Sequence, residues 1–230
     1  MPGAPENSLW VRNLAAGMQV SAVGTTPVDL NREDCLLSPA EREGMAWAVS
    51  IGIRLSPSVL EGVSDRPTLL YKWHYQQANN YLDRTAFQLA QHILGRGYRA
   101  LPVPASQMVD WTAERGHLSH RAVAELAGLG WRGRNNLLVH PEFGSRIRLA
   151  TVLTDLPLDG PSAPLENRCG DCRRCVEACP AGALGESYQQ YRLDACRGLL
   201  TRFSRERGIG VRICGICVKA CPGQGTGRDS

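Results

Sequence analysis

Apolar positions recur along the first 155 residues with spacings that predict alternating helices and strands. Between residues 81 and 94 the apolar side chains fall three and four apart, which predicts one long helix that begins near Thr68 and ends at Gly95. The run over residues 46–53 is apolar almost throughout and too short for an average helix. It predicts a strand that is covered on both faces.

Shorter segments extend the same pattern. We expect helices over residues 8–18 and 118–126, a helix start with Ser38 as the N-cap before Pro39, and strands over residues 20–23, 98–103, 137–140 and 147–153. Because helices and strands alternate, these residues predict one α/β layer domain. Within it, His117 and His120 are spaced to form a helical pair, which we expect to face solvent.

Residues 154–164 interrupt the pattern, since they contain three prolines and a glycine. A helix or a strand does not continue through so many breakers. We therefore place a domain boundary here, with an α/β cofactor-binding domain over residues 1–160 and a second domain over residues 161–230. The fold class expected for the whole chain is α+β.

The composition is that of an ordinary globular protein, with 43% hydrophobic and 21% charged residues among 230. No stretch approaches the roughly 18 apolar residues of a membrane helix. The first residues also lack the features of a signal peptide, so we expect a cytoplasmic protein that does not associate with a membrane. The formal net charge is +4, but the arginines are scattered among acidic residues, which favours a compositional bias over a nucleic-acid surface.

The cysteines mark the second domain, because only Cys35 of the nine lies before residue 169. We expect Cys35 to be a small buried apolar side chain. The others form two related runs with Cys196 between them: Cys169-x2-Cys172-x2-Cys175-x3-Cys179-Pro180 and Cys214-x2-Cys217-x3-Cys221-Pro222. A disulfide framework would need an oxidising compartment and wider spacings than these.

The first run has the spacing of bacterial ferredoxins that hold two 4Fe-4S clusters, in which the last cysteine of a run binds the other cluster. We therefore predict a crossed ligation. The first cluster is assigned to Cys169, Cys172, Cys175 and Cys221, and the second to Cys179, Cys196, Cys214 and Cys217. Two zinc sites are the alternative. Zinc sites built from paired Cys-x2-Cys units, however, do not require a third cysteine followed by proline.

A glycine-rich segment precedes these runs. Residues 127–144 read AGLGWRGRNNLLVHPEFG, and residues 147–158 lead from there toward the first cysteine run. Together they resemble epoxyqueuosine reductases and their relatives, the reductive dehalogenases, over about residues 115–222. The resemblance implies a nitroreductase-like α/β domain that holds base-off cobalamin, followed by a ferredoxin-like domain with two 4Fe-4S clusters.

The same resemblance implies which residues would approach the corrin. They are Gly128, Gly130, Gly133, Arg134, Asn135, Asn136, His140, Pro141, Gly144 and Ser145. The glycines would let the backbone come close to a bulky flat ligand. Taken alone, the loop could equally be a tight turn between two elements.

Two features depart from the family pattern. The nearest candidates for its acidic proton donor are Asp110 and Glu114, and both align poorly. The sequence ends eight residues after Pro222, so the C-terminal helical-repeat region of epoxyqueuosine reductases has no counterpart in it. On that ground we expect a short stand-alone member and do not expect tRNA as a partner.

The resulting hypothesis is an iron-sulfur oxidoreductase that passes electrons through two clusters to cobalamin. By resemblance, reduced ferredoxin or flavodoxin would supply the electrons, and a small molecule or a corrinoid protein would be the substrate. One alternative is an electron-transfer or cobalamin-handling protein without a small-molecule substrate. Another is a flavin-based reductase, although the Gly-x-Gly-x-x-Gly spacing over residues 128–133 follows a helix and so argues against a dinucleotide fold.

Overall fold

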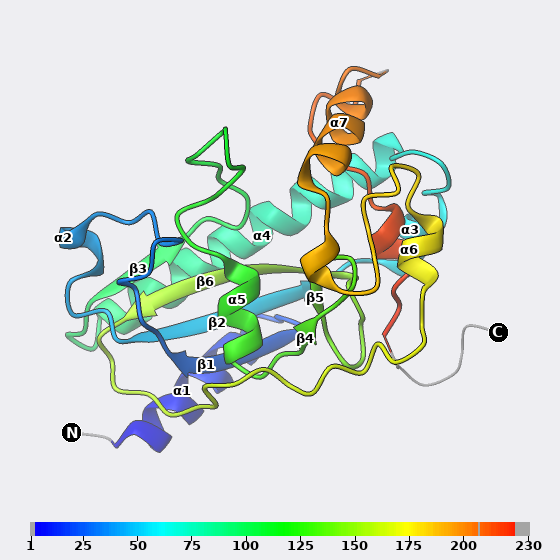
Figure 1. Cartoon of the computed structure of the whole chain (residues 1–230). Coiled ribbons are helices and arrows are strands. Elements are labelled where there is room, and N and C mark those ends of the chain that lie inside the picture. Colours follow the sequence, from blue (N-terminus) through cyan, green and yellow to red (C-terminus); the bar gives the residue numbers. More distant parts are fainter. Residues whose placement is uncertain (1–2, 207, 224–230) are drawn as a thin grey trace. The chain divides into compact units, whose positions relative to one another are not determined.

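The computed structural model describes residues 3–206 and 208–223, and Figure 1 shows the ribbon. The chain divides into two compact units, each built from three segments. The first unit comprises Met1–Ile53, Asn79–Leu129 and Arg148–Leu165, and the second comprises Arg54–Ala78, Gly130–Ile147 and Glu166–Ser230. Helices and sheet occur together, which confirms the α+β class. The boundary placed near residue 160 stays a prediction, since these packing units are discontinuous in sequence.

A four-stranded sheet forms the centre of the first unit, with the strand order β1-β2-β6-β3. The strands are β1 (Ala22–Pro27), β2 (Trp47–Arg54), β3 (Ala100–Val103) and β6 (Ile147–Thr154). β1 pairs antiparallel with β2, and β3 pairs antiparallel with β6. β2 and β6 are central and buried along most of their length, so the strand expected over residues 46–53 is confirmed.

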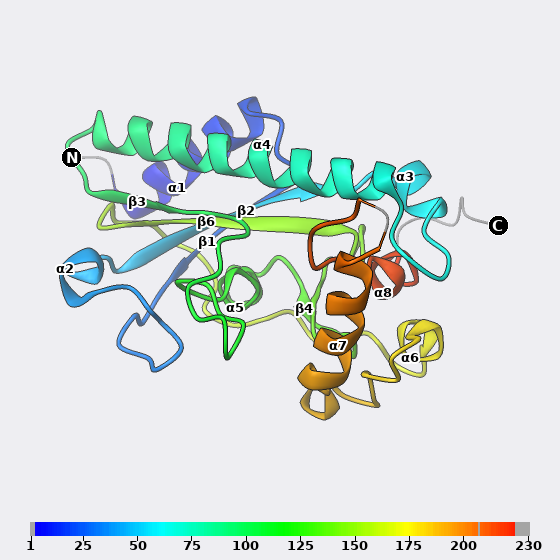
Figure 2. The ribbon, with the colours of Figure 1, turned by 90° about the horizontal axis from the view of Figure 1, so that it is seen from above.

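Helices cover one face of this sheet, as Figure 2 shows. They are α1 (Ala4–Gly17) and the part of α4 (Leu69–Leu94) that follows residue 78. Leu82, Leu89 and Ile93 of α4 share a core with Val49 and Ile51 of β2. The three- and four-residue spacing of the apolar side chains thus produces the long helix that it predicts.

The other face is covered by α5 (His120–Leu126) and by the segment that contains α2 (Pro39–Arg42). Ser38 caps α2 as expected, because its hydroxyl accepts a hydrogen bond from the Glu41 amide at 3.3 Å. The Glu41 carboxylate in turn accepts one from the Ser38 amide at 2.7 Å. This reciprocal pair satisfies two amides that a helix start otherwise leaves without partners. No helix among residues 3–206 and 208–223 is long and apolar enough to cross a membrane.

His120 does not face solvent, so that prediction is wrong. Its Nε2 lies 2.9 Å from the carbonyl oxygen of Pro104, and its Nδ1 lies 2.9 Å from Thr151 Oγ1. Since a carbonyl can only accept, Nε2 carries the proton and Nδ1 accepts from the threonine hydroxyl. Burial lowers the pKa of His120 to about 4, so the ring is neutral at pH 7.

The neutral ring makes stability depend on pH. An unfolded imidazole has a pKa near 6.5, and between that value and about 4 the unfolded state binds more protons than the folded state. The free energy of unfolding therefore falls as the pH drops through this window. From pH 7 to pH 5, anaerobic urea unfolding should show that the wild type loses about 2 kcal/mol more than His120→Gln, which does not titrate. Equal losses in the two proteins would contradict the burial of this ring.

The second unit contains short elements around the cysteines. They are α3 (Pro57–Glu61), the first ten residues of α4, β4 (Trp131–Arg132), β5 (Leu138–Val139), α6 (Arg174–Ala178), the 3-10 turn η1 (Tyr188–Gln190), α7 (Leu193–Ser204) and α8 (Ile216–Lys219). β4 and β5 pair antiparallel as a separate two-stranded sheet. α6 packs against α8, which brings the two cysteine runs together.

Candidate metal centre

All eight cysteines after residue 168 lie in the second unit as free thiols. Helices hold the next-to-last cysteine of each run, Cys175 on α6 and Cys217 on α8, while Cys196 lies on α7. The remaining five lie in the connections: Cys169, Cys172, Cys179, Cys214 and Cys221. The short helices position these sulfurs because two- and three-residue gaps fit one turn of chain.

The strongest electrostatic interactions between the thiols fall within two groups. Burial raises the pKa of Cys175 to about 11, and the nearby thiols of Cys221, Cys169 and Cys172 raise it further. We name these four the first thiol set. It joins three cysteines of the first run to the last cysteine of the second run.

A second thiol set surrounds Cys217, which is half-buried. Its pKa is raised first by burial, then by Cys214, Cys196 and Cys179, and least by Cys175 of the first thiol set. Burial likewise raises the pKa of Cys214 to about 11, with further contributions from Cys196 and Cys179. The two sets have the membership that the crossed ligation predicts, and ligation itself stays a prediction.

The donor set fits an iron-sulfur cluster. Indole Nε1 of Trp131 donates to Cys169 Sγ at 3.4 Å, and the Ala183 amide donates to Cys179 Sγ at the same distance. A hydrogen bond from Arg174 lowers the pKa of the Cys172 thiol. N–H groups that donate to sulfur are a means by which proteins tune iron-sulfur clusters. Among the described residues, no group of three or more His, Cys, Asp or Glu side chains has the arrangement of a single-ion site.

The turn after β5 holds Cys221 in place. The Ser145 amide donates to the carbonyl of Cys221 at 3.0 Å. Gly144 has a φ of +59°, and a Cβ added there would lie 2.0 Å from the same carbonyl oxygen. His140 and Gly144 close the turn with two backbone hydrogen bonds of 2.9 and 2.8 Å. This part of the predicted corrin-binding segment therefore positions a predicted cluster ligand.

Polar side chains of the same segment are also engaged within the second unit. Asn135 Nδ2 donates to Ser145 Oγ at 2.8 Å, and Asn135 Oδ1 accepts from the Leu137 amide at 3.2 Å. Arg134 Nη2 donates to the Gly170 carbonyl at 2.8 Å, beside the first cysteine run. Asn136 adopts a φ of +57° within the loop that joins β4 to β5. These contacts attach the loop to the cysteine-bearing segment.

The glycines of the loop serve the chain's own packing. A Cβ at Gly130 would lie 2.1 Å from the Val139 carbonyl, and one at Gly133 would lie 2.5 Å from Val139 Cγ2. Gly128, in the first unit, has a φ of +71°. The alternative of a tight turn thus accounts for these glycines, and their approach to a corrin stays a prediction.

His140 completes the turn through its ring. Its Nδ1 accepts from the amides of Glu142 and Phe143 at 3.2 and 3.4 Å, so the neutral ring carries its proton on Nε2. Burial lowers the pKa of His140, which favours this neutral form. The ring stacks on Phe143 with centroids 4.5 Å apart, and Pro141 leads into the turn.

The two acidic candidates lie on one loop of the first unit. Asp110 Oδ1 accepts from the Thr112 and Ala113 amides at 2.9 Å each, and Oδ2 lies 3.2 Å from Arg115 Nη2. The Ala113 amide, followed by Arg115, lowers the pKa of Asp110 and holds it as the carboxylate. Glu114, at the tip of the same loop, has a φ of +52°.

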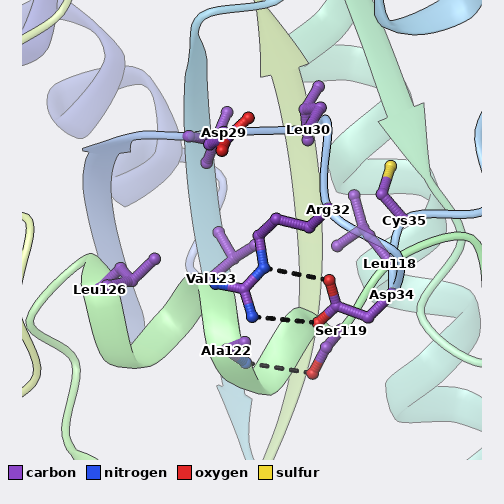
Figure 3. Close-up of a pocket in the computed structure, with 11 residues that line it drawn as sticks. Asp29, Leu30, Arg32, Asp34, Cys35, Leu118, Ser119, Ala122, Val123 and Leu126 are labelled. Carbon is purple, nitrogen blue, oxygen red and sulfur yellow. Dashed lines mark hydrogen bonds and ion pairs between the residues drawn. The ribbon is translucent and has the colours of Figure 1, made fainter. Parts of the chain in front are cut away.

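Figure 3 shows a cavity of the first unit, with a volume of about 130 Å³. Leu30, Leu118 and Val123 provide much of its apolar wall, and the Arg32–Asp34 ion pair lies beside it. Cys35 also lines the cavity and is half-buried, so it is less enclosed than expected. Small-molecule pockets usually measure about 300–1,000 Å³, so this cavity is too small for a corrin.

Comparison with known proteins places these features in a family. An epoxyqueuosine reductase from Bacillus cereus is 32% identical over 196 residues, which cover 81% of this chain and 49% of the relative. An epoxyqueuosine reductase solved with an epoxyqueuosine-modified tRNA-Tyr stem loop matches with a TM-score of 0.66 at 23% identity, over 94% of this chain and 65% of that one. The chain belongs to the epoxyqueuosine reductase family.

A reductive dehalogenase shares the fold. Its structure, described as suggesting a mechanism for B12-dependent dehalogenation, matches with a TM-score of 0.77 at 21% identity, over 95% of this chain and 32% of that one. No protein-family model matches the chain. The chain spans about half the length of the Bacillus cereus relative.

The exclusion of tRNA as a partner is wrong. The curated relatives are epoxyqueuosine reductases, and one solved epoxyqueuosine reductase contains a tRNA stem loop. The expectation rested on where the sequence ends, which does not bear on what the residues present can bind. Scattered arginines are equally weak evidence against tRNA, because a folded chain can gather them on one surface.

Two contributors to the site escaped the sequence analysis. Trp131 belongs to the glycine-rich segment, yet neither spacing nor composition indicates that its indole N–H reaches Cys169. Arg174 lies inside the first cysteine run, between the predicted ligands Cys172 and Cys175, and interacts with both. A signal for Arg174 existed, because a cation between closely spaced cysteines suits negatively charged sulfur.

Proposed function

We propose that this chain is an iron-sulfur oxidoreductase of the epoxyqueuosine reductase type, with one 4Fe-4S cluster held by each thiol set. The observation that carries the proposal is the grouping of the eight thiols into two sets of four across both runs. When bound, each cluster supplies reversible one-electron transfer. Residues 161–230 would then form the ferredoxin-like domain and residues 1–160 the nitroreductase-like domain.

The residues of the second unit would hold the clusters in a partly buried environment. The neutral thiols of Cys175 and Cys214, whose pKa values burial raises to about 11, would release protons as metal binds. Trp131, Arg174 and the Ala183 amide would donate to the sulfurs. The turn over residues 140–145 would keep Cys221 beside the first run.

Cobalamin is the cofactor that we propose for the nitroreductase-like domain. The resemblance over the glycine-rich segment supports it, and one fold neighbour is described as B12-dependent. Two observations do not support it: Asn135 and Ser145 hydrogen-bond to each other, and the cavity in Figure 3 is too small for a corrin. We therefore assign no chemical step to cobalamin, and flavin is the alternative that extraction of the bound cofactor would reveal.

Glu114 is the better candidate for the proton donor. Reductive steps consume protons as well as electrons, so a donor must hold a proton near neutral pH. Asp110 is a poor choice because two backbone amides and Arg115 stabilise its charged form. Glu114 lies four residues further on, at the tip of that loop, and its backbone adopts the left-handed conformation that functional loops often contain.

The test combines metal content with turnover. Anaerobically reconstituted protein should contain about eight irons and about eight sulfides per chain, with no stoichiometric zinc. With cobalamin and reduced flavodoxin it should reduce epoxyqueuosine in a tRNA stem loop, measured by mass spectrometry of the nucleosides. Glu114→Gln should lower the rate by about 10²–10⁴-fold, whereas the matched Asp110→Asn should retain most of it.

Each alternative gives a different result. Stoichiometric zinc in place of iron would overturn the iron-sulfur proposal. Eight irons without turnover of epoxyqueuosine or halogenated substrates, together with reduction of cobalamin on a partner protein, would indicate an electron-transfer or cobalamin-handling role. Loss of turnover in Asp110→Asn but not in Glu114→Gln would reverse the assignment of the proton donor.

A further inference from the structure

The indole of Trp131 makes a directed contact with a predicted cluster ligand. Trp131 lies on β4 and is only 3% exposed. Its Nε1 lies 3.4 Å from Cys169 Sγ. An indole N–H can only donate, so the sulfur is the acceptor. The contact links the glycine-rich segment to the first thiol set.

A positive charge adds to this donor. Arg174 hydrogen-bonds to Cys172, and its guanidinium interacts with the thiols of Cys221 and Cys175. Arg174 therefore interacts electrostatically with three of the four sulfurs of the first thiol set. The fourth sulfur, that of Cys169, accepts the hydrogen bond from the indole N–H. In the second thiol set the sulfurs of Cys179 and Cys214 receive the backbone amides of Ala183 and Ile216. The two sets thus differ in the donors that contact them.

The consequence concerns reduction potentials. A cluster gains one negative charge when it takes up an electron, and part of that charge resides on its thiolate sulfurs. N–H donors and cations near those sulfurs stabilise the reduced state more than the oxidised state, which raises the potential. A buried cluster with fewer such donors is harder to reduce.

We propose that Trp131 is a positioning residue that raises the reduction potential of the first cluster through its N–H···S hydrogen bond, with Arg174 acting in the same direction. The first cluster is then the more easily reduced of the two. The inference rests on the proposed function, because it requires clusters on both thiol sets. It assigns Trp131 a role in setting the energetics of electron transfer, in addition to filling the interior beside β5.

The experiment removes the N–H and keeps the shape. Position 131 is replaced by β-(3-benzothienyl)alanine, in which sulfur takes the place of the indole N–H, and by Phe as a genetic variant. The reconstituted proteins are titrated anaerobically with dithionite and mediators and followed by electron paramagnetic resonance. Trp73→Phe is the matched control, since Trp73 is 56% exposed.

Loss of the N–H should lower the ratio of reduced to oxidised first cluster about tenfold at a fixed potential, a shift of about 59 mV to more negative values. The reduction potential of the second cluster should not shift, and neither potential should shift in the Trp73→Phe control. Arg174→Gln should move the first cluster in the same direction. Iron should stay at about eight per chain in the benzothienyl protein, because the ring keeps its size.

The outcomes separate the two proposals. A benzothienyl protein with full iron and unchanged potentials would overturn the role of Trp131 and leave the proposed function intact. A shift confined to the second cluster would also overturn it. Wild-type protein that takes up no iron would instead remove the proposed function. If Trp131→Phe loses iron through poor packing, the benzothienyl protein decides the question.

Discussion

Replacing Cys179 by alanine should remove the second cluster and leave the first, although Cys179 belongs to the first cysteine run. The reason is that the Cys179 thiol acts on Cys214 and Cys217, whereas the thiols that act on Cys175 are Cys221, Cys169 and Cys172. Iron should fall from about eight to about four per chain. Cys221→Ala should give the same iron content through loss of the other cluster.

Alkylation distinguishes which cluster is lost. Anaerobic iodoacetamide should label Cys196, Cys214 and Cys217 in Cys179→Ala, and Cys169, Cys172 and Cys175 in Cys221→Ala. Trypsin cleaves after the basic residues of this region, which are Arg168, Arg173, Arg174, Arg192, Arg197, Arg212 and Lys219. Cys196 and Cys221 then lie on separate peptides, whereas the other six thiols share three peptides in pairs, within which fragmentation locates the label. Mass spectrometry of the peptides then reports the ligand set of each remaining cluster.

The Cys35→Ala control and the labelling pattern of an uncrossed ligation complete the test. Cys35→Ala should keep about eight irons, since Cys35 lies in the first unit among apolar side chains. If each run instead served its own cluster, Cys179→Ala would expose the first-run cysteines and protect Cys214 and Cys217. That pattern would contradict the crossed ligation and, with it, the pairing of Cys221 with the first run.

Features that depend on local chemistry could be predicted from the sequence. The cap at Ser38 needs only a hydroxyl and a glutamate three residues on, and both are adjacent in the chain. The long helix and the buried strand β2 follow from spacing and length of apolar runs. The composition of the two thiol sets follows in the same way from cysteine spacing, once the crossing of the last cysteine is assumed.

Features that depend on contacts between distant residues could not be predicted from the sequence. The two-residue strand β4 is too short to leave a pattern, and it exists because Trp131 and Arg132 pair with β5. The sequence leaves open whether the glycines at 130 and 133 approach a ligand or form a tight turn, and it does not reveal that a Cβ at either position would lie within 2.5 Å of Val139 atoms. His120 was placed toward solvent because a helix spacing does not reveal that Pro104 and Thr151 lie beside it.

Candidate proton donors illustrate the same limit. The sequence does not distinguish Asp110 from Glu114, since both are carboxylic acids near the glycine-rich segment. Their difference comes from the bend of the loop, which aims two amides and Arg115 at Asp110. A carboxylate held in this way keeps its charge, so the geometry of five residues decides between candidates that the sequence leaves open.

Gly144→Ala should be among the most damaging single changes in the second unit. The residue has a φ of +59°, where an alanine costs about 1–3 kcal/mol. Its added Cβ would also lie 2.0 Å from the Cys221 carbonyl and 2.2 Å from the Gly223 amide, both of them backbone atoms. Forcing the chain apart there adds about 1–3 kcal/mol and displaces Cys221 from the first thiol set. We expect a loss of about 4 kcal/mol in the free energy of unfolding, with iron falling to about four per chain.

Gly210→Ala separates the conformational cost of a positive φ from the cost of the steric clash with the Cys221 backbone. Gly210 has nearly the same φ, +62°, but a Cβ there meets nothing within 4 Å. Anaerobic urea unfolding, followed by tryptophan fluorescence, should show for Gly210→Ala only the conformational cost of about 1–3 kcal/mol, with all of the iron retained. The difference between the two variants measures how strongly the turn over residues 140–145 constrains Cys221. Equal stability and equal iron in both would mean that the Cys221 backbone can move freely, and that this turn does not position the ligand.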